Sequence, residues 1–431
     1  MRYCVRIRRN QCEIATFLCD NPSVSLSADT SPCTGEALVR CWFVQLNDNF
    51  PYRHIIFPVL GHTSFEKAVD AMEHFSCKTE IIAGAGAVGQ LAELRSKRLL
   101  LVTDPYFQKN GTAQAVARAA KAETVEIFDR VAPDPTVELA AAGAYRVKAF
   151  QPDLIVALGG GSAMDCAKAM AYFGGGSYRF AAIPTTSGSG SEVTDFAILT
   201  HNGIKHPLVD ENLRPDLAIL DSDLLQELPK GLIADSGFDA LSHALEACCA
   251  GNAGSCTGAL ARESFRMAYH ALPRSYGGDR SVRLEMHKAA AMAGLAFTQA
   301  GLGLCHAMAH ALGGAFHVPH GRLNAILLPA VMECNAPAAL GAYADMARAV
   351  GITASSDVMA LRGLKNGLVK LRRELGLPQT LAQAGVDLRK LREQEQKIVE
   401  AALADPCCET NPVKPEAHMV RQILQDVMGR G

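Results

Sequence analysis

The sequence lacks long apolar stretches and has almost no net charge. Runs such as LLLV at 99–102 and LIVAL at 154–158 fall far short of the roughly 18 to 20 apolar residues that cross a bilayer. The 42 Lys and Arg residues nearly balance the 44 Asp and Glu residues, which leaves a formal net charge of −2. Such a chain has no long-range field to attract nucleic acid or an acidic membrane surface. We therefore expect neither of these as a partner, and expect a small-molecule ligand instead.

Aromatic residues and paired cysteines are scarce as well. Aromatic residues make up 6% of the chain, with one Trp, and the 14 Cys residues include no CxxC pair. No basic start followed by a long apolar run marks a secretory signal, so reduced thiols and a cytoplasmic location are expected. With 431 residues, 49% of them hydrophobic, and 37 Gly, the chain is long enough for two α/β-type domains.

Periodic patterning divides the chain into three parts. Residues 1–71 hold five Cys and the single Trp but show no sustained strand or helix period, so we interpret them as an appendage, either without stable structure or upstream of a true start at Met72. Residues 72–234 alternate strand and helix patterns, which predicts right-handed βαβ units and a parallel sheet covered on both faces. We expect this part to be the nucleotide-binding domain because it holds the glycine turn described below. Residues 235–431 carry only Ala- and Leu-rich helical patterns and are expected to form an all-α domain.

The elements expected in the α/β part can be placed by residue. Strands are predicted at 98–104 and 123–129, and helices at 112–122 and 137–150. The stretch PDLIVALGGGSAMDCAKAMAYF then reads as strand, glycine turn and helix. In that turn Gly160, Gly161 and Ser162 open the helix, where backbone N–H groups and the helix N-terminus favour a diphosphate. Because structural glycine turns outnumber phosphate sites, this pattern alone is a weak signal.

Three further features add to the glycine turn. Asp104 ends the strand at 98–104, where a carboxylate would accept hydrogen bonds from an adenosine ribose and repel a 2′-phosphate, which favours NAD over NADP. The alternative is that Asp104 only begins a helix or turn. A second glycine-rich turn, GAGA, stands at 84–87, and IPTTSGSGSEVT at 183–194 offers hydroxyls for a ribose and nicotinamide.

Histidines gather in the stretch GLGLCHAMAHALGGAFHVPHG. His306 and His310 are four residues apart, as are Asp239 and His243 in GFDALSHALEA, so each pair shares one face of a helix. His320 follows in the first stretch. Taken singly, each histidine is more often an ordinary core or surface residue. Several imidazoles among Ala, Leu, Met and Gly are costly unless paired or coordinated, so we predict a divalent transition-metal site.

From about Met72 onward the chain resembles the iron-containing (group III) alcohol dehydrogenases. Within that family it is similar to the ethanol and propanol dehydrogenases of ethanolamine and propanediol utilisation. The resemblance covers roughly five-sixths of the chain and rests on the stretches VTDPYFQKNG, VAPDPTVE, ALGGGSAMDCAKAM, AIPTTSGSGSEVT, RPDLAILD, GFDALSHALEA, GLGLCHAMAHALGGAFHVPHGRLNAILLPAVMECN and NPVKP.

The resemblance implies roles for particular residues. The metal ligands would be Asp239, His243, His306 and His320. His310 would lie beside the nicotinamide and substrate as the catalytic proton relay. The diphosphate and neighbouring ribose would meet Gly160, Gly161, Ser162 and Asp165. The nicotinamide half would lie nearer Thr185, Thr186, Thr194 and Lys205.

The resemblance also implies a fold, a metal and a reaction. The fold is a Rossmann-like domain followed by an all-α metal-binding domain, shared with dehydroquinate synthases, and the chain is expected to assemble as homodimers or larger homo-oligomers. Fe²⁺ is the expected metal because the chain has the full set of one Asp and three His; zinc is the alternative under the Irving–Williams order. The expected reaction is NAD-dependent interconversion of a short primary alcohol and its aldehyde, in which the metal polarises the oxygen and a hydride passes to C4 of the nicotinamide.

Two other functions stay open from the sequence. A dehydroquinate-synthase-like lyase would use the same metal and NAD, but would need several basic groups for an acidic, sugar-like substrate, which HAMAHALGG does not offer. A non-catalytic scaffold associated with a bacterial microcompartment would use residues 1–71 as a targeting extension. Removal of those residues is expected to change location or association and to leave turnover intact.

Overall fold

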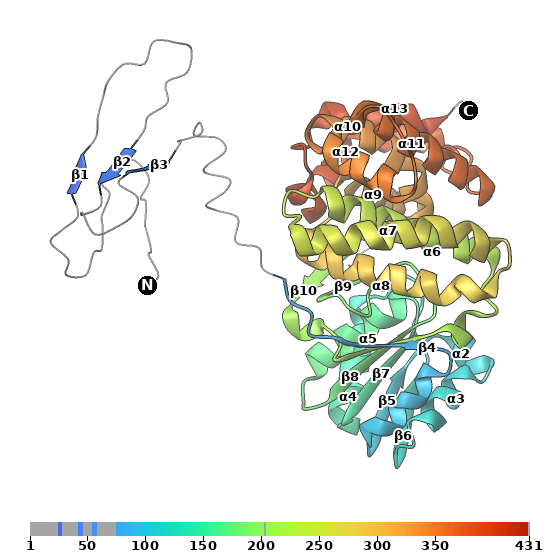
Figure 1. Ribbon diagram of the computed structural model, residues 1–431. Helices are drawn as coiled ribbons and strands as arrows, with labels where there is room; N and C mark the ends of the chain where they lie inside the picture. The colour runs from blue at the N-terminus through green and yellow to red at the C-terminus, as the bar shows by residue number, and fades with distance from the viewer. Residues whose placement is uncertain (1–24, 28–41, 46–53, 58–74, 202–203, 430–431) are drawn as a thin grey trace, which may run out of the picture. The chain divides into compact units, whose positions relative to one another are not determined.

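The computed structural model describes residues 25–27, 42–45, 54–57, 75–201 and 204–429 (Figure 1). The chain divides into two compact units, Met1–Glu73 and His74–Gly431. In the first unit three short strands pair antiparallel in the order β1 (Ser25–Ser27), β2 (Trp42–Gln45) and β3 (His54–Phe57). The interpretation of residues 1–71 as an appendage lies almost wholly outside the described residues. The division of the remainder into 72–234 and 235–431 stays a prediction.

A six-stranded parallel sheet forms the first half of the second unit. Its order is β4-β11-β8-β7-β5-β6, with bounds Glu80–Gly84 for β4, Arg98–Val102 for β5, Thr124–Phe128 for β6, Leu154–Gly159 for β7, Arg179–Pro184 for β8 and Leu217–Asp221 for β11. The predicted parallel sheet is confirmed, and β5 and β6 lie where strands were expected. A separate antiparallel hairpin joins β9 (Phe196–His201) to β10 (Ile204–Val209).

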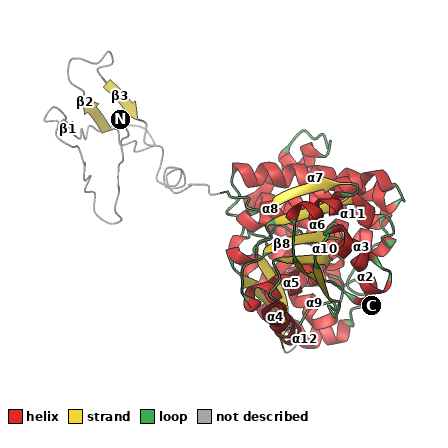
Figure 2. Cartoon of the chain, turned by 90° about the horizontal axis from the view of Figure 1, so that it is seen from below, coloured by secondary structure: helices red, strands yellow, loops and turns green. Residues whose placement is uncertain are grey.

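Helices cover both faces of this sheet (Figure 2). Successive strand side chains point to opposite faces, so Leu99 and Leu101 pack with η1 (Ala87–Leu94) and α3 (Thr112–Ala119). Leu100 packs on the other face with α4 (Val137–Phe150) and α5 (Gly161–Gly174). Strands buried on both faces read as continuous apolar runs, which is why LIVALG is buried throughout β7.

The strand order reverses at the neighbouring strands β5 and β7. The two strands pair directly, with Val102 opposite Ala157. The chain leaves β5 for β6 on one side and leaves β7 for β8 on the other, with α3 and α5 on opposite faces. Open α/β sheets bind ligands at the carboxyl ends of strands at such a reversal. Asp104 follows β5 and the glycine turn follows β7, so both lie at this point.

The second half of the unit is helical. No strand follows β11 in the described part of the chain, which confirms the expected all-α region. Figure 1 shows α6, α7 and α8 between the sheet and the later helices. The long helices are α6 (Lys230–Cys249), α7 (Ser255–Tyr276), α8 (Arg283–Ala300), α9 (Leu304–Phe316), α10 (His320–Ala349), α11 (Asp357–Glu374), α12 (Leu388–Leu403) and α13 (Ala417–Met428).

Short helices complete the described chain: α2 (Pro105–Lys109), η2 (Glu211–Leu213), η3 (Ser222–Leu225), η4 (Arg280–Val282) and η5 (Pro406–Thr410).

Helix α10 is the longest of the described helices and runs through the core. By length and composition alone it could cross a membrane, although polar residues interrupt its apolar runs. Half of its most apolar window is buried, and Leu323 and Ile326 belong to the largest hydrophobic cluster, so it is a core helix. Pro329 within it has no N–H to donate to the carbonyl of Ala325. The guanidinium of Arg372 on α11 donates to that carbonyl instead, at 2.9 Å.

Candidate metal and coenzyme site

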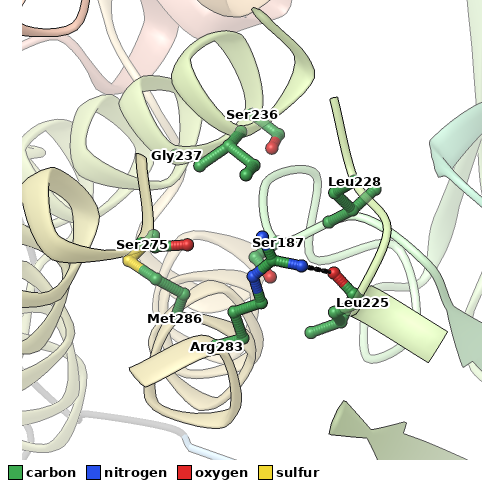
Figure 3. A pocket seen from close by; sticks show the side chains of 9 residues that line it. Ser187, Leu225, Leu228, Ser236, Gly237, Ser275, Arg283 and Met286 are labelled. Atoms are coloured by element: carbon green, nitrogen blue, oxygen red, sulfur yellow. Dashed lines mark hydrogen bonds between the residues drawn. The ribbon is translucent and has the colours of Figure 1, made fainter. Parts of the chain in front are cut away.

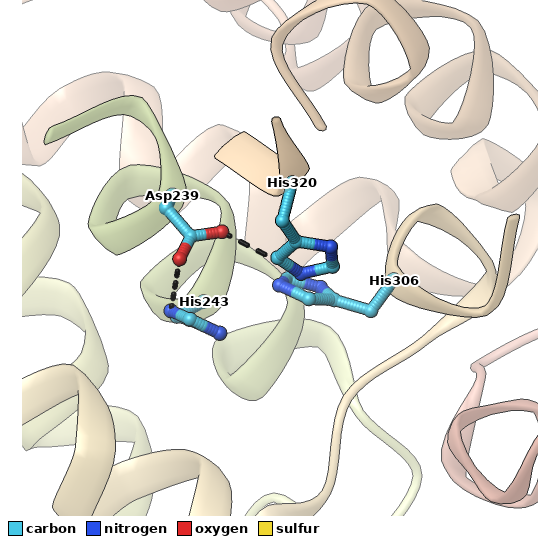
Figure 4. A group of neighbouring side chains, drawn as sticks. All are labelled: Asp239, His243, His306 and His320. Carbon is cyan, nitrogen blue, oxygen red and sulfur yellow. Dashed lines mark ion pairs between the residues drawn. The ribbon is translucent and has the colours of Figure 1, made fainter. Parts of the chain in front are cut away.

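Three helices bring one carboxylate and three imidazoles together (Figure 4). Helix α6 carries Asp239 and His243, α9 carries His306, and α10 begins at His320. One ligand atom from each of the four lies within 4.8 Å of the others. The Asp239 carboxylate is 3.6 Å from Nε2 of His320 and 4.0 Å from Nδ1 of His243, and the His243 and His306 rings stack with centroids 4.4 Å apart. The four residues predicted as ligands therefore converge.

A glycine lets α10 start against α6. A Cβ on Gly321 would lie 1.9 Å from the carbonyl oxygen of Asp235 and 3.0 Å from Cβ of Asp239, so no other residue fits without a backbone shift. Next to it, the guanidinium of Arg322 donates to both carboxylate oxygens of Asp235, at 3.1 and 2.9 Å. This close approach and the forked ion pair hold His320 against Asp239.

Two of the imidazoles are oriented by fixed acceptors. Nδ1 of His243 lies 3.2 Å from the carbonyl oxygen of Gly188, and Nδ1 of His306 lies 2.6 Å from the Glu246 carboxylate. Because a carbonyl and a carboxylate only accept hydrogen bonds, Nδ1 of each ring carries the proton. Nε2 of each ring then carries the lone pair that a metal needs, as in the carboxylate–histidine arrangement common at metal sites. In this structure the Asn324 amide donates to Nε2 of His306 at 3.1 Å.

Glu246 also begins helix α9. Its carboxylate accepts the backbone N–H of Gly303 at 3.0 Å and of Cys305 at 2.8 Å, while the Asn411 side chain accepts that of Leu304 at 3.0 Å. Burial raises the pKa of Glu246 to about 7, and these backbone bonds work against that rise. Sequence analysis did not select Glu246, although its position three residues after His243 places it near the same face of α6.

The burial of the cluster favours the ligand form of the histidines. Desolvation lowers the pKa of His243 to about 4 and lowers those of His306 and His320 well below the usual value, so the rings are neutral. A neutral imidazole binds metals, whereas an imidazolium does not. Asn324 donates to the Asp239 carboxylate at 2.8 Å and steadies it. One carboxylate and three neutral imidazoles fit a divalent transition-metal ion.

The glycine turn lies at the N-terminus of α5, with Gly160 as its N-cap and Gly161 as its first residue. Asp104 begins α2, as the alternative interpretation held, because its Oδ1 accepts the backbone N–H groups of Tyr106 and Phe107. Its Oδ2 faces the turn, 3.8 Å from where a Cβ on Gly159 would lie. The ribose contact of Asp104 stays a prediction.

Four of the other coenzyme candidates surround the same helix end. Ser162 is partly exposed on the first turn of α5, and the Thr186 hydroxyl would lie 3.4 Å from a Cβ on Gly160. Thr185 donates its backbone N–H to the Gly159 carbonyl, which joins the ends of β8 and β7. Asp165, one turn into the helix, accepts a hydrogen bond from the Ser191 hydroxyl at 2.8 Å.

Two candidates are held by bonds within the protein. Thr194 is fully buried, and its hydroxyl accepts a hydrogen bond from Nζ of Lys168 at 2.9 Å. Lys205 forms an ion pair with Asp134 at 2.7 Å. Their contacts with a nicotinamide stay predictions.

Comparison with known families covers both halves of the second unit. The model of the iron-containing alcohol dehydrogenases matches residues 78–222, and the model of the C-terminal region of that family matches residues 233–428. The chain belongs to the iron-containing alcohol dehydrogenase family. This membership makes it an oxidoreductase and sets aside the lyase and scaffold alternatives.

Relatives of this iron-containing alcohol dehydrogenase match along most of its length. The chain is 36% identical to the 1-propanol dehydrogenase PduQ of Salmonella typhimurium over 370 residues, covering 83% of this chain and 100% of the relative. It is 35% identical to the NADPH-dependent butanol dehydrogenase of Clostridium saccharobutylicum over 380 residues, with 83% and 98% covered. The solved iron-containing alcohol dehydrogenase of Thermococcus thioreducens superposes with a TM-score of 0.76 at 32% identity, with 82% and 99% covered.

His310 of this alcohol dehydrogenase lies beside the four-residue cluster. It is one helical turn after His306 on α9, and its ring stacks on that of His320 with centroids 4.9 Å apart and an angle of 11°. Nδ1 of His310 lies 2.8 Å from the carboxylate of Asp405, and the side chain is 28% exposed. The structure therefore places His310 next to the candidate ligands and partly open to solvent, while its position beside a nicotinamide and substrate stays a prediction. Its role as a relay stays a prediction.

A small cavity of this dehydrogenase lies apart from the cluster, between η3 and the N-terminal ends of α6 and α8 (Figure 3). It shares no residue with the four candidate ligands. Arg283 lines it and donates to the carbonyl of Leu225. Nearby, the ring of His287 bonds Ser187 at 2.9 Å and the carbonyl of Pro184 at 3.0 Å, which ties the loop after β8 to α8.

Proposed function

We propose that this chain catalyses the NAD-dependent, Fe²⁺-dependent interconversion of a short-chain primary alcohol, of the ethanol and propanol class, and its aldehyde. The observation that carries the proposal is the convergence of Asp239, His243, His306 and His320 within 4.8 Å. Two relatives, a 1-propanol dehydrogenase and a butanol dehydrogenase, support the substrate class.

The side chains supply the geometry of the reaction. Held by the four ligands, Fe²⁺ would polarise the oxygen of the alcohol or aldehyde as a Lewis acid. Glu246 and the Gly188 carbonyl hold Nδ1 of two imidazoles and leave Nε2 of each as the nitrogen for the metal. His310 stands beside the cluster with Nε2 available to take or return the proton that accompanies hydride transfer.

The coenzyme is proposed to bind at the reversal of strand order. The N-terminus of α5 offers Gly160, Gly161 and Ser162 to the diphosphate. The second carboxylate oxygen of Asp104 faces this turn and would repel a 2′-phosphate, so NAD is the proposed coenzyme although one relative is described as NADPH-dependent. Asp104→Ser keeps a helix-capping oxygen and removes the charge. It is expected to raise the ratio of kcat/KM for NADPH to that for NADH; an unchanged ratio would refute the role of Asp104.

Metal content and turnover test the central proposal. Protein purified without oxygen is expected to contain iron and to oxidise NADH with ethanal, propanal or butanal. His306→Ala and His320→Ala are each expected to lose both the bound metal and the turnover. Full NAD-dependent alcohol oxidation by either variant would refute the ligand assignment. Zinc in place of iron in the active protein would overturn the choice of metal alone.

The proposal extends to assembly and location. We infer a cytoplasmic homo-oligomer that associates with a bacterial microcompartment through residues 1–71. Light scattering and co-sedimentation with shell proteins, with and without those residues, test this. Loss of turnover in the shortened chain would contradict the view that these residues are an appendage.

A further inference from the structure

A carboxylate from the C-terminal region contacts the histidine beside the cluster. Asp405 is the N-cap of η5, and its Oδ1 accepts the backbone N–H of Cys407 at 2.9 Å. Its Oδ2 lies 2.8 Å from Nδ1 of His310. Each oxygen thus has its own partner, and the side chain is only 15% exposed. The start of η5 therefore fixes the direction in which the carboxylate meets His310.

The contact decides which nitrogen of His310 carries the proton. Burial acts to raise the pKa of Asp405, but the hydrogen bonds from His310 and Cys407 lower it to about 2, so the group is a carboxylate. A carboxylate only accepts hydrogen bonds, so the tautomer of His310 that fits this contact has its proton on Nδ1. The ring is further fixed by stacking on His320 and by an edge contact with His306, whose centroid lies 6.3 Å away. Nε2 is then the nitrogen with a free lone pair.

A second metal ion is the competing explanation for this group. His310, Asp405 and Cys407 each offer a ligand atom within 4.8 Å of the other two. Burial raises the pKa of the Cys407 thiol well above its usual value, and a hydrogen bond to Asp405 adds to this effect. A metal needs the thiolate, which these surroundings disfavour. The distances are those of hydrogen bonds, so a dyad explains the group better than an ion.

We propose that Asp405 is a positioning residue for His310: it fixes the tautomer with Nδ1 protonated and turns Nε2 toward the cluster, where the substrate proton is exchanged. The inference rests on the proposed alcohol dehydrogenase function, because it assigns the transferred proton to His310. The arrangement parallels the aspartate that holds a catalytic histidine in hydrolase triads.

Asp405→Asn tests the proposal with little change in shape. The amide oxygen can still accept the N–H of Cys407, but the NH₂ group then faces Nδ1 and forces the proton of His310 onto Nε2. In the triads, the equivalent change lowers kcat by about 10⁴, and a loss of about 10² or more is expected here, with KM and iron content within about twofold. Asp279→Asn is the matched control, because Asp279 caps η4 in the same way and is distant from the cluster in sequence.

A double-mutant cycle separates positioning from a general structural effect. In a His310→Gln background, Asp405→Asn is expected to cause no further loss of kcat, because its effect passes through the imidazole. An equal loss of kcat in both backgrounds, or unchanged kcat in Asp405→Asn, would overturn the proposal.

A measurement without turnover keeps this inference distinct from the proposed function. In metal-free protein labelled with ¹⁵N-histidine and studied above neutral pH, the His310 signals, assigned by their loss in His310→Gln, should show the Nδ1–H tautomer. Asp405→Asn should show the Nε2–H tautomer. An Nε2–H tautomer in the unmodified protein would refute the positioning role of Asp405. If the unmodified protein shows no turnover, the proposed function is refuted, whichever tautomer His310 has.

Discussion

Replacing Glu246 by Gln should weaken metal binding without removing any candidate ligand. The Glu246 carboxylate serves the Nδ1–H of His306 and the backbone N–H groups at the start of α9. Its two oxygens divide this work, because Oε2 faces His306 and Gly303 while Oε1 faces Cys305. A Gln side chain has one acceptor oxygen and places an NH₂ group against donors on the other side.

The magnitude follows from those contacts. Whichever way the amide turns, at least one buried donor faces another donor, which costs about 1–3 kcal/mol of the free energy of unfolding. Loss of the carboxylate behind a ligating histidine weakens metal affinity by about 10- to 100-fold. Because Asp239, His243 and His320 are untouched, binding should weaken and not disappear.

Chelator competition measures the iron affinity, and urea unfolding of the metal-free protein measures stability. Glu227→Gln is the matched control, since Glu227 is 81% exposed and its ion pair with Arg280 lies at the surface. It should change neither quantity. Iron affinity of Glu246→Gln within twofold of the unmodified protein would refute the reasoning that this carboxylate orients His306.

Three further predictions follow from the fold. Gly321→Ala should lower metal affinity at least about tenfold, because its Cβ would meet the α6 backbone. Gly341→Ala on the same helix is the control: its Cβ meets nothing within 4 Å, so this variant should bind the metal normally. Burial lowers the pKa of the fully buried His287 from 6.5 to about 4. The folded protein therefore gains up to about 3 kcal/mol of unfolding free energy above pH 6.5, and it loses this contribution as the pH falls through about 4. Urea unfolding across pH should show a shallower slope in His287→Gln; an equal slope would contradict this. Arg372→Met leaves a helix carbonyl without its donor and should cost about 1–3 kcal/mol in urea unfolding, unlike Arg373→Met at the exposed neighbour; equal losses would argue against that bond.

Much of the architecture was predictable from local patterns. The continuous apolar strands and the loss of strand signals after the sheet predicted the parallel sheet and the helical region. The four-residue spacing of Asp239 and His243 and the histidine-rich stretch after it predicted a metal site, and the family resemblance selected His306 and His320 as its other ligands. Each of these patterns lies within a short stretch of sequence, so it can be recognised without knowledge of the tertiary contacts.

The groups that orient the histidines were not predictable in the same way. Asp405 meets His310 across 95 residues, and no spacing in the sequence connects a residue of η5 with a residue of α9. The Gly188 carbonyl that holds His243 is a backbone group, and any residue type offers one. Asp104 shows a second limit of prediction from sequence: an Asp at this position is expected both as a helix cap and as a ribose ligand. Only the arrangement in space distinguishes such roles.

The bond between the Gly188 carbonyl and His243 joins the two halves of the catalytic unit. Gly188 belongs to the loop whose Ser191 donates a hydrogen bond to Asp165 on α5. If the proposed dinucleotide moves this loop on binding, it also changes how His243 is held. By thermodynamic reciprocity, occupancy of either site must then change the affinity of the other by the same factor. Binding of the proposed metal and binding of the proposed coenzyme would then be coupled through this loop, even though the candidate residues for the two share no side chain.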